Sequence, residues 1–279
     1  VVHANSETYY YDQNNTDLGL NKKTSTKHWL RNMPVALELA YSDNIVAPTF
    51  WQKNQLPKKL QAFCKVIYDG VDIKTFKIDN SKIRRVPILT YGTRGMEPMR
   101  CFPQFIKELP AIFGKYPNMR VEIAGENEIN YGGRPPEIEN SWKEWALNYL
   151  EKHKVLDRVS WLGRLAHDSY INWIQNSWCH VYLSHPFVAS WSLVEVQCCG
   201  TPIICSDIPA IKEMVFQRGA SFVDHRHPGF LLEPVIQAMG EQELRRGLAS
   251  SSSVPQNLRC SQTMKAWASV ACLEVSTTT

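Results

Sequence analysis

The chain has 279 residues, of which 44% are hydrophobic and 21% charged, as is ordinary for a globular protein of one large or two moderate domains. The net charge of +4 indicates no nucleic-acid partner, although it suits small anionic ligands. The eight cysteines form no Cys-x-x-Cys pair and no zinc-ligand spacing with histidine, so we expect reduced thiols, a cytoplasmic location and no metal. No apolar run approaches the ~18 residues of a membrane span.

The first quarter of the chain predicts few regular elements. Residues 1–20 are polar and aromatic and are expected to be irregular. A helix is expected over residues 25–42, with a break at Pro34. Its apolar side chains recur at helical spacing: Trp29, Met33, Ala36, Leu37 and Ala40. Further elements are expected as a strand at 45–47, a helix at 51–60, a strand at 64–67 and a turn at 69–72.

From about residue 86 onward, short apolar runs alternate with helical patterns. The predicted strands are 88–91, 121–124, 159–162, 179–183, 202–205 and 221–223. The predicted helices are 102–115, 141–154, 168–176, 192–199 and 209–216. Such alternation predicts an α/β protein with a doubly wound parallel sheet, whose ligand lies at the carboxyl ends of the strands. The serine run 250–253 is of low complexity, and one more helix is expected at 263–274.

Two arginines follow the predicted strand 88–91. Arg94 and Arg100 stand in the segment Arg94-Gly-Met-Glu-Pro-Met-Arg100, which is expected to be a loop. A guanidinium group can bind two phosphate oxygens at once, and Gly92 and Gly95 let the backbone approach a ligand closely. The alternative is that both arginines only keep a surface loop soluble.

A helix start and a carboxylate follow the predicted strand 179–183. The segment Ser190-Trp191-Ser192 opens the next predicted helix, whose unpaired N–H groups suit an anion. Glu195, on the opening turn, suits a sugar diol. Together with the arginines, this pattern predicts a site for a nucleoside diphosphate sugar.

The alternative interpretation of Glu195 is a capping box. Ser192-x-x-Glu195 has the required spacing, in which the carboxylate binds only the backbone. Ser141-x-x-Glu144 has the same spacing on a helix whose aromatic face is expected to pack. Spacing alone therefore does not separate the two roles, and the position beyond a strand end favours a ligand.

The histidines offer weaker candidates. His167 and His185 are expected in loops before a helix and before a proline. His225 and His227 lie two apart in a polar loop without a further ligand, which is more typical of solvated histidines than of a metal site. No metal is therefore predicted.

Five segments occur in the same order as in a known family. They are Asp69-Gly-Val-Asp72, Thr93 to Arg100, Val121-Glu-Ile-Ala-Gly125-Glu126, Arg158-Val-Ser-Trp-Leu-Gly163-Arg-Leu165 and Glu195 to Ile204. From about residue 25 to 240, the chain resembles the retaining glycosyltransferases of family 4, which have the GT-B fold of two facing Rossmann-like domains. The resemblance implies that residues 1–72 end an incomplete acceptor-side domain, 73–245 bind the nucleotide-sugar donor, and 246–279 form a tail.

The resemblance also implies roles for the candidate residues. Arg94 would hold the donor diphosphate, and Arg100 would be its displaced companion, so both are assigned to catalysis. Glu195 would bind the ribose hydroxyls. The other residues assigned to the donor are Ser190, Trp191, Ser192, Leu165 and Glu126.

The partners that the resemblance implies are a UDP- or GDP-linked sugar and a glycan, lipid or protein acceptor. No metal or other cofactor and no nucleic acid is expected, and peripheral membrane association of the full-length parent is left open. One departure stands out, because the family's first paired glutamate corresponds to Phe187. This departure keeps open the alternative of a non-catalytic nucleotide-sugar binding protein. A dinucleotide-dependent oxidoreductase is disfavoured, since no G-x-G-x-x-G follows the first strand.

Overall fold

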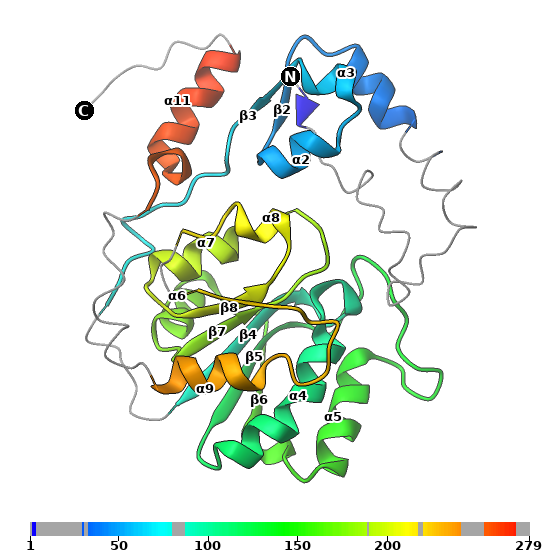
Figure 1. Cartoon of the computed structure of the whole chain (residues 1–279), viewed down its shortest axis with the longest axis vertical. Helices are drawn as coiled ribbons and strands as arrows, with labels where there is room; N and C mark the ends of the chain where they lie inside the picture. Colours follow the sequence, from blue (N-terminus) through cyan, green and yellow to red (C-terminus); the bar gives the residue numbers. More distant parts are fainter. Residues whose placement is uncertain are drawn as a thin grey trace.

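The computed structural model describes residues 2–3, 30, 33–79, 87–188, 190–216, 220–240 and 254–271. A large lobe contains a six-stranded sheet and its helices, and a smaller lobe contains a three-stranded sheet (Figure 1). The segment after β3 connects the two lobes, and a C-terminal helix returns to the small lobe.

The large lobe is a parallel sheet with the strand order β6-β5-β4-β7-β8-β9. Its strands are β4 (Ile88–Gly95), β5 (Arg120–Glu126), β6 (Val159–Gly163), β7 (Cys179–Tyr182), β8 (Ile203–Ser206) and β9 (Ser221–Val223). Every residue of β7 and β8 is buried, as expected for central parallel strands covered on both faces. The predicted doubly wound α/β fold is confirmed.

Helices cover both faces of this sheet. They are α4 (Phe102–Lys115), α5 (Trp142–Lys152), α6 (His167–Gln175), α7 (Trp191–Cys198), α8 (Pro209–Lys212) and α9 (Leu232–Gly240). One core cluster joins the sheet to α4, α5 and α9, and a second joins it to α6, α7 and α8 (Figure 1). The burial of these two apolar clusters on opposite faces stabilises the lobe.

The structure corrects three sequence predictions in this lobe. β4 extends to Gly95, so Arg94 lies on a strand and not in a loop. The predicted helix 209–216 is shorter and ends at Lys212. Helix α9 was not predicted, because Pro234 in its first turn resembles a helix breaker although proline is tolerated there.

The small lobe has a parallel sheet with the order β1-β2-β3. Its strands are β1 (Val2–His3), β2 (Ile45–Ala47) and β3 (Cys64–Val66), and its helices are α2 (Phe50–Gln55), α3 (Lys58–Gln61) and residues 33–40. The prediction that residues 1–20 are irregular is wrong for β1, and the rest of that segment lies outside the described residues, as do 25–29. The single predicted helix 51–60 is two helices, because proline at position 57 interrupts it.

The first predicted helix buries a different face from the expected one. Met33 and Leu37 are 43% and 58% exposed, whereas Leu39 is buried against β2, with Val35 beside it. Val35 and Leu39 are four residues apart, so they share one side of the helix.

Helix α11 (Cys260–Ala271) begins three residues before its predicted start, and the serine run 250–253 and residues 272–279 lie outside the description. Its Val270 packs against Val46 and Ile67 of the small lobe. The division of the chain into 1–72, 73–245 and 246–279 stays a prediction. Within the described residues, no helix is long and apolar enough to cross a membrane.

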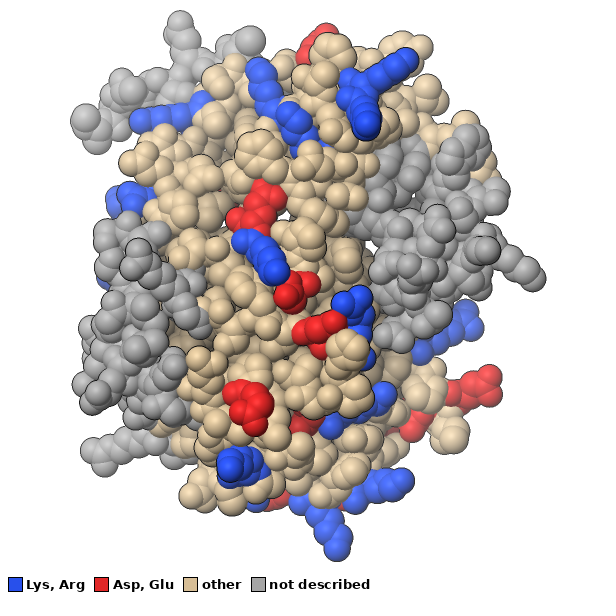
Figure 2. All heavy atoms as spheres, viewed as in Figure 1, with Lys and Arg blue, Asp and Glu red and all other residues tan. Residues whose placement is uncertain are grey.

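One carboxylate joins the two lobes directly. Glu213, just after α8, accepts hydrogen bonds from the backbone N–H groups of Phe50 and Trp51 at 2.6 and 2.7 Å, and from the Tyr68 hydroxyl at 2.7 Å. A carboxylate at the N-terminus of α2 also interacts favourably with the helix dipole. On the face in Figure 2, basic and acidic side chains of the described residues interleave without forming a broad basic patch.

Candidate functional site

A cavity of about 470 Å³ lies where the strand order reverses, at the carboxyl ends of β4, β5 and β7. From β4 the chain moves outward to β5 and β6, and it then returns to the other side of β4 as β7. The loops after these two central strands diverge and leave a crevice, which is where open α/β sheets bind ligands. The residues that line the cavity include Arg94, Arg100, Glu126, Leu165, Ser190 and Ser192.

Arg94 projects from the last residues of β4 with its side chain exposed. Gly125 lets β5 approach Thr93 of β4, and Gly95 lets the loop after β5 approach β4, since a Cβ at Gly125 would overlap Thr93 and one at Gly95 would overlap Asn130. Among the described residues, no carboxylate forms an ion pair with Arg94. Its guanidinium group is therefore available to an anion in the cavity.

Arg100 is held in place by neighbours. Its Nη1 donates to Ser184 Oγ at 2.9 Å and lies 3.3 Å from the Tyr182 hydroxyl. Its guanidinium carbon lies 5.1 Å from the ring centroid of Phe187 and 6.0 Å from that of Tyr131. The two rings pack together, with their centroids 4.7 Å apart. Arg100 is therefore a fixed cation beside the cavity, in contrast to Arg94.

Glu97 holds the loop that carries Tyr131, one of the two rings beside Arg100. The side chain is fully buried and accepts the backbone N–H groups of Asn130 and Tyr131 at 2.9 and 2.7 Å. Burial raises the pKa of the Glu97 carboxyl, although these hydrogen bonds oppose the shift. Glu97 thereby fixes the loop that places Tyr131 beside Arg100.

The N-terminus of α7 opens at the same cavity. Ser190 caps the helix by accepting the Ser192 N–H at 3.3 Å, and the two hydroxyl oxygens lie 2.8 Å apart. The backbone N–H of Ser190 donates to the Tyr182 hydroxyl at 3.1 Å, which links the helix start to the tyrosine that contacts Arg100. The positive end of the helix dipole therefore lies beside the arginines.

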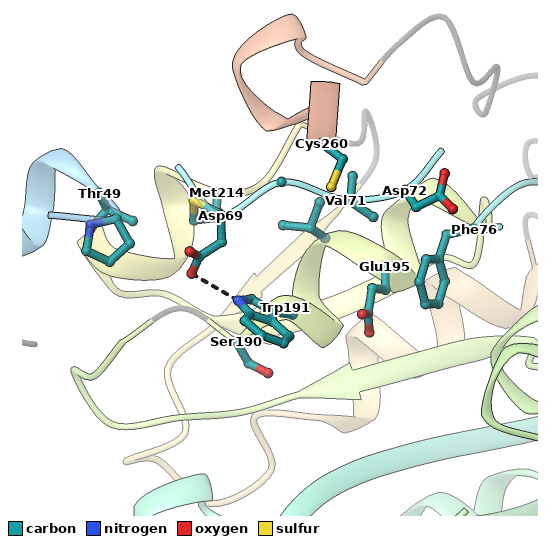
Figure 3. Close-up of a pocket in the computed structure, with 13 residues that line it drawn as sticks. Thr49, Asp69, Val71, Asp72, Phe76, Ser190, Trp191, Glu195, Met214 and Cys260 are labelled. Atoms are coloured by element: carbon teal, nitrogen blue, oxygen red, sulfur yellow. Dashed lines mark hydrogen bonds between the residues drawn. The ribbon is translucent and has the colours of Figure 1, made fainter. Parts of the chain in front are cut away.

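Glu195 lies in a neighbouring cavity of about 200 Å³ between the two lobes (Figure 3). Its Oε2 accepts a hydrogen bond from the Tyr170 hydroxyl at 2.9 Å. Burial raises the pKa of Glu195, and the Tyr170 hydrogen bond and the charge of His167 partly offset this rise. The carboxylate makes no capping box with Ser192, because Ser190 is the cap. The capping interpretation of Glu195 is therefore wrong.

Trp191 joins α7 to the segment that connects the two lobes. Its indole is 68% exposed, and its Nε1 donates to the Asp69 carboxylate at 2.9 Å (Figure 3). Both residues line the 200 Å³ cavity, and Ser190 lines both cavities. The predicted site residues thus divide between two adjacent cavities that share the start of α7.

Two further predicted residues, at and after the ends of β5 and β6, line the larger cavity. Glu126 ends β5, and its Oε1 lies 3.8 Å from Arg164 Nη1. Leu165 is half-buried and packs against the core cluster that contains α6, α7 and α8. Glu126 pairs with Gly95 across β5 and β4, so it lies close to Arg94 in the chain fold, and the roles of Glu126 and Leu165 stay predictions.

Sequence reasoning missed four residues that organise the site: Glu97, Tyr170, Tyr182 and Asp69. Tyr182 carried a usable signal, because it belongs to a predicted strand whose carboxyl end was expected to face the ligand. Tyr170 and Asp69 acquire their partners only through the fold, so local sequence contains no sign of those contacts.

Two family models match the chain. The model described as "Glycosyl transferases group 1" matches residues 89–252, and the one described as "Glycosyl transferase family 4 group" matches residues 3–76. A sequence search of curated proteins found no match.

Solved structures share the fold at low sequence identity. Anabaena Alr3699/HepE in complex with UDP and glucose has a TM-score of 0.69 at 17% identity, over 89% of this chain and 69% of that chain. Sucrose-phosphate synthase from Thermosynechococcus elongatus has 0.72 at 14%, over 94% and 66%. A glycosyltransferase from Rickettsia africae has 0.67 at 15%, over 81% of this chain and 62% of that chain. The present chain thus spans less than two thirds of the Rickettsia protein.

Proposed function

The chain belongs to the group 1 glycosyltransferases, and we propose that it acts in metal-independent, retaining transfer of a sugar from a nucleoside diphosphate to a glycan, lipid or protein acceptor. The complex of the Anabaena neighbour with UDP and glucose supports uridine nucleotides as the first ligands to try. The cytoplasmic location and the peripheral membrane association of the parent stay predictions from the sequence.

The observation that carries this proposal is that Arg94 and the start of α7 line one cavity. Negative charge grows on the diphosphate as its bond to the sugar breaks, so groups already oriented toward it lower the barrier. Arg94 would supply a mobile bidentate contact and Arg100 a fixed charge. The N–H groups of Ser190 and Ser192 already donate within the protein, so the start of α7 would contribute the positive end of its dipole and the two serine hydroxyls.

The remaining residues would orient the donor. The Glu195 carboxylate, held by Tyr170, would accept hydrogen bonds from ribose hydroxyls that reach past Ser190 toward the smaller cavity. Leu165 and Glu126, which line the larger cavity, would contact the base. No step of this scheme assigns a proton donor or a nucleophile to the chain itself.

Two experiments test the proposal. Titration of the chain with UDP, GDP and the corresponding nucleosides should show that the diphosphates bind at least tenfold more tightly. Transfer should then be measured with isotope-labelled UDP- and GDP-sugars and the full-length parent. Failure of every donor both to transfer and to hydrolyse would contradict the catalytic proposal.

A non-catalytic nucleotide-sugar binder is the second candidate, and Phe187 favours it. The ring is 7% exposed and packs on Arg100, where the resemblance places a glutamate that contacts the donor sugar. A phenyl ring accepts no ordinary hydrogen bond from a sugar hydroxyl. Tight binding of UDP or GDP by the full-length parent, without turnover of any sugar donor, would favour this candidate.

A further inference from the structure

Three side chains of types that can ligate a metal lie close together, although they are far apart in the sequence. Cys101 precedes α4, His185 follows β7, and His225 follows β9. All three are buried, with exposures between 0% and 6%. One potential ligand atom from each lies within 4.8 Å of the other two.

We propose that Cys101, His185 and His225 bind a zinc ion. A thiolate and two imidazoles are ligand types that Zn²⁺ prefers, with bond lengths of about 2.3 Å to sulfur and about 2.0–2.1 Å to nitrogen. In a tetrahedral site these lengths place the ligand atoms about 3.3–3.6 Å apart. Side-chain rotations that close the present separations by little more than an ångström would bring the three atoms to these distances, and a water molecule would take the fourth position.

Neighbouring groups already orient two of the ligands. Nδ1 of His225 lies 3.1 Å from Ser206 Oγ, and Ser206 Oγ accepts the Ser184 N–H at 3.0 Å. A hydrogen bond from the second ring nitrogen is the usual support of a zinc-bound histidine. The backbone N–H of His185 donates to the Met99 carbonyl at 3.0 Å, which fixes the histidine near the Cys101 turn.

The backbone at Cys101 gives an independent reason to assign a role to its side chain. Its φ of 55° lies in the left-handed region, which is unfavourable for a residue with a Cβ and favourable for glycine. Cysteine at this position costs about 1 kcal/mol or more in backbone strain. A thiol that ligates a metal would offset that cost.

Zinc binding would connect the start of α4 to the ends of β7 and β9. Cys101 follows Arg100 directly, and His185 lies two residues before Phe187, which packs on that arginine. The ion would therefore brace the fixed cation of the larger cavity without contacting a sugar donor. On binding, the Cys101 thiol forms a bond to zinc and its proton passes to solvent. The inference goes beyond the proposed function, and the sequence spacing predicted no such site.

Metal titration of the full chain tests the inference directly. After chelator treatment, the protein should bind one equivalent of Zn²⁺ or Co²⁺, and the Co²⁺ form should show a thiolate-to-cobalt charge-transfer band. The melting temperature should rise with free Zn²⁺ concentration. Cys101→Gly, which suits the left-handed backbone, should abolish the band and the zinc dependence.

Matched controls are the exposed residues Cys260 and His227. Cys260→Ser and His227→Ala should bind the metal as wild type does. If Cys101→Gly does not fold, His225→Gln serves the same purpose and should weaken Zn²⁺ binding at least tenfold. Absence of a cobalt–thiolate band in the wild type, or its persistence in Cys101→Gly, would overturn the inference whether or not the chain binds nucleotides.

Discussion

Two helices of this chain begin with the same pair of residues, Ser–Trp, yet they meet different surroundings. Ser141 caps α5 by accepting the Glu144 N–H at 3.1 Å. Ser190 caps α7 by accepting the Ser192 N–H at 3.3 Å. The start of α5 is half-buried at the surface of the large lobe and lines neither cavity, whereas α7 opens on a cavity beside two arginines. The same local chemistry therefore serves packing in one place and leaves a candidate anion site in the other.

The first residue of each helix extends this contrast. The indole of Trp142 donates to the Gly133 carbonyl at 2.7 Å within the large lobe. The indole of Trp191 donates to the Asp69 carboxylate, in the segment that connects the lobes, at 2.9 Å. One tryptophan fastens a loop, and the other joins α7 to the connecting segment where the cavities meet.

The glutamates show why spacing alone misleads. Glu144 is three residues past its cap, and its carboxylate accepts the Asn140 N–H at 2.9 Å. The equivalent position in α7 is Leu193, since the cap is Ser190. Glu195 stands two residues farther along and reaches a tyrosine hydroxyl and a cavity instead. The cap must be located before the carboxylate can be interpreted.

The largest expected effect is on the affinity for a nucleoside diphosphate at the cavity beside the start of α7. Arg94→Ala should weaken UDP or GDP binding by about 1.5–3 kcal/mol, or roughly tenfold to 150-fold, because a charge-assisted contact is lost. Nucleoside affinity should hardly change. Arg134→Ala, an exposed arginine in the segment that leads to α5, is the matched control in calorimetric titrations. An equal loss for nucleoside and diphosphate would mean that Arg94 supports the fold.

The two serine caps provide the next comparison. Ser141→Ala and Ser190→Ala should each lower the free energy of unfolding by about 1 kcal/mol, since each removes a side-chain acceptor at a helix start. Only Ser190→Ala should also weaken diphosphate binding, because Ser190 lines the larger cavity and Ser141 does not. Denaturant unfolding and titration of both variants check this, and equal affinities would contradict the role of the α7 start.

The two glutamates should differ by a smaller amount. Glu195→Gln should weaken ribose-containing ligands by about 0.5–1 kcal/mol, because a charged acceptor becomes neutral. Glu144→Gln should leave affinity unchanged. Titrations with UDP compare the variants, and an unchanged affinity in Glu195→Gln would remove Glu195 from the site.

The pH dependence of stability tests the environment of Glu195 separately. Its pKa is raised in the folded protein, chiefly by burial, so the folded state holds this proton more tightly than the unfolded state. Its contribution to stability is therefore present in acid and is lost as pH rises from about 4 through the folded pKa. The melting temperature of wild type relative to Glu195→Gln should fall over that range. A rising difference would show that the carboxylate is stabilised in its charged form.

The smallest effect should come from Trp191→Phe. Its hydrogen bond to Asp69 is largely exposed, so the free energy of unfolding should fall by less than about 0.5 kcal/mol. Trp142→Phe, which loses a hydrogen bond in a half-buried position, should cost about 1 kcal/mol. Thermal unfolding of both variants measures the two losses of stability. A larger loss in Trp191→Phe than in Trp142→Phe would contradict the view that the exposed hydrogen bond contributes less.

Much of the fold was predictable because each central strand is a short apolar run. The sequence also indicated which loops follow the carboxyl ends of β4 and β7, and hence that Arg94 and Ser190 would come together. Strand β1 and helix α9 were not predictable in the same way. Strand β1 has only two residues, too few to show an apolar alternation. The proline near the start of α9 is typical of a helix end, so the apolar spacing of that segment did not indicate a helix.

The interior of the site depended on contacts that no local pattern contains. Arg100 is fixed by Tyr182 and Phe187, which are more than 80 positions away in the sequence. The cap of α7 is set by backbone geometry, which the serine spacing did not specify. For the same reason, Cys101 and His225 showed no metal-ligand spacing although the fold brings them together.

The most direct test is a crystal structure of the chain with UDP. We expect diphosphate oxygens within hydrogen-bond distance of both the Arg94 guanidinium group and a serine hydroxyl at the start of α7. A diphosphate seated in the smaller cavity, or held without Arg94, would contradict the account.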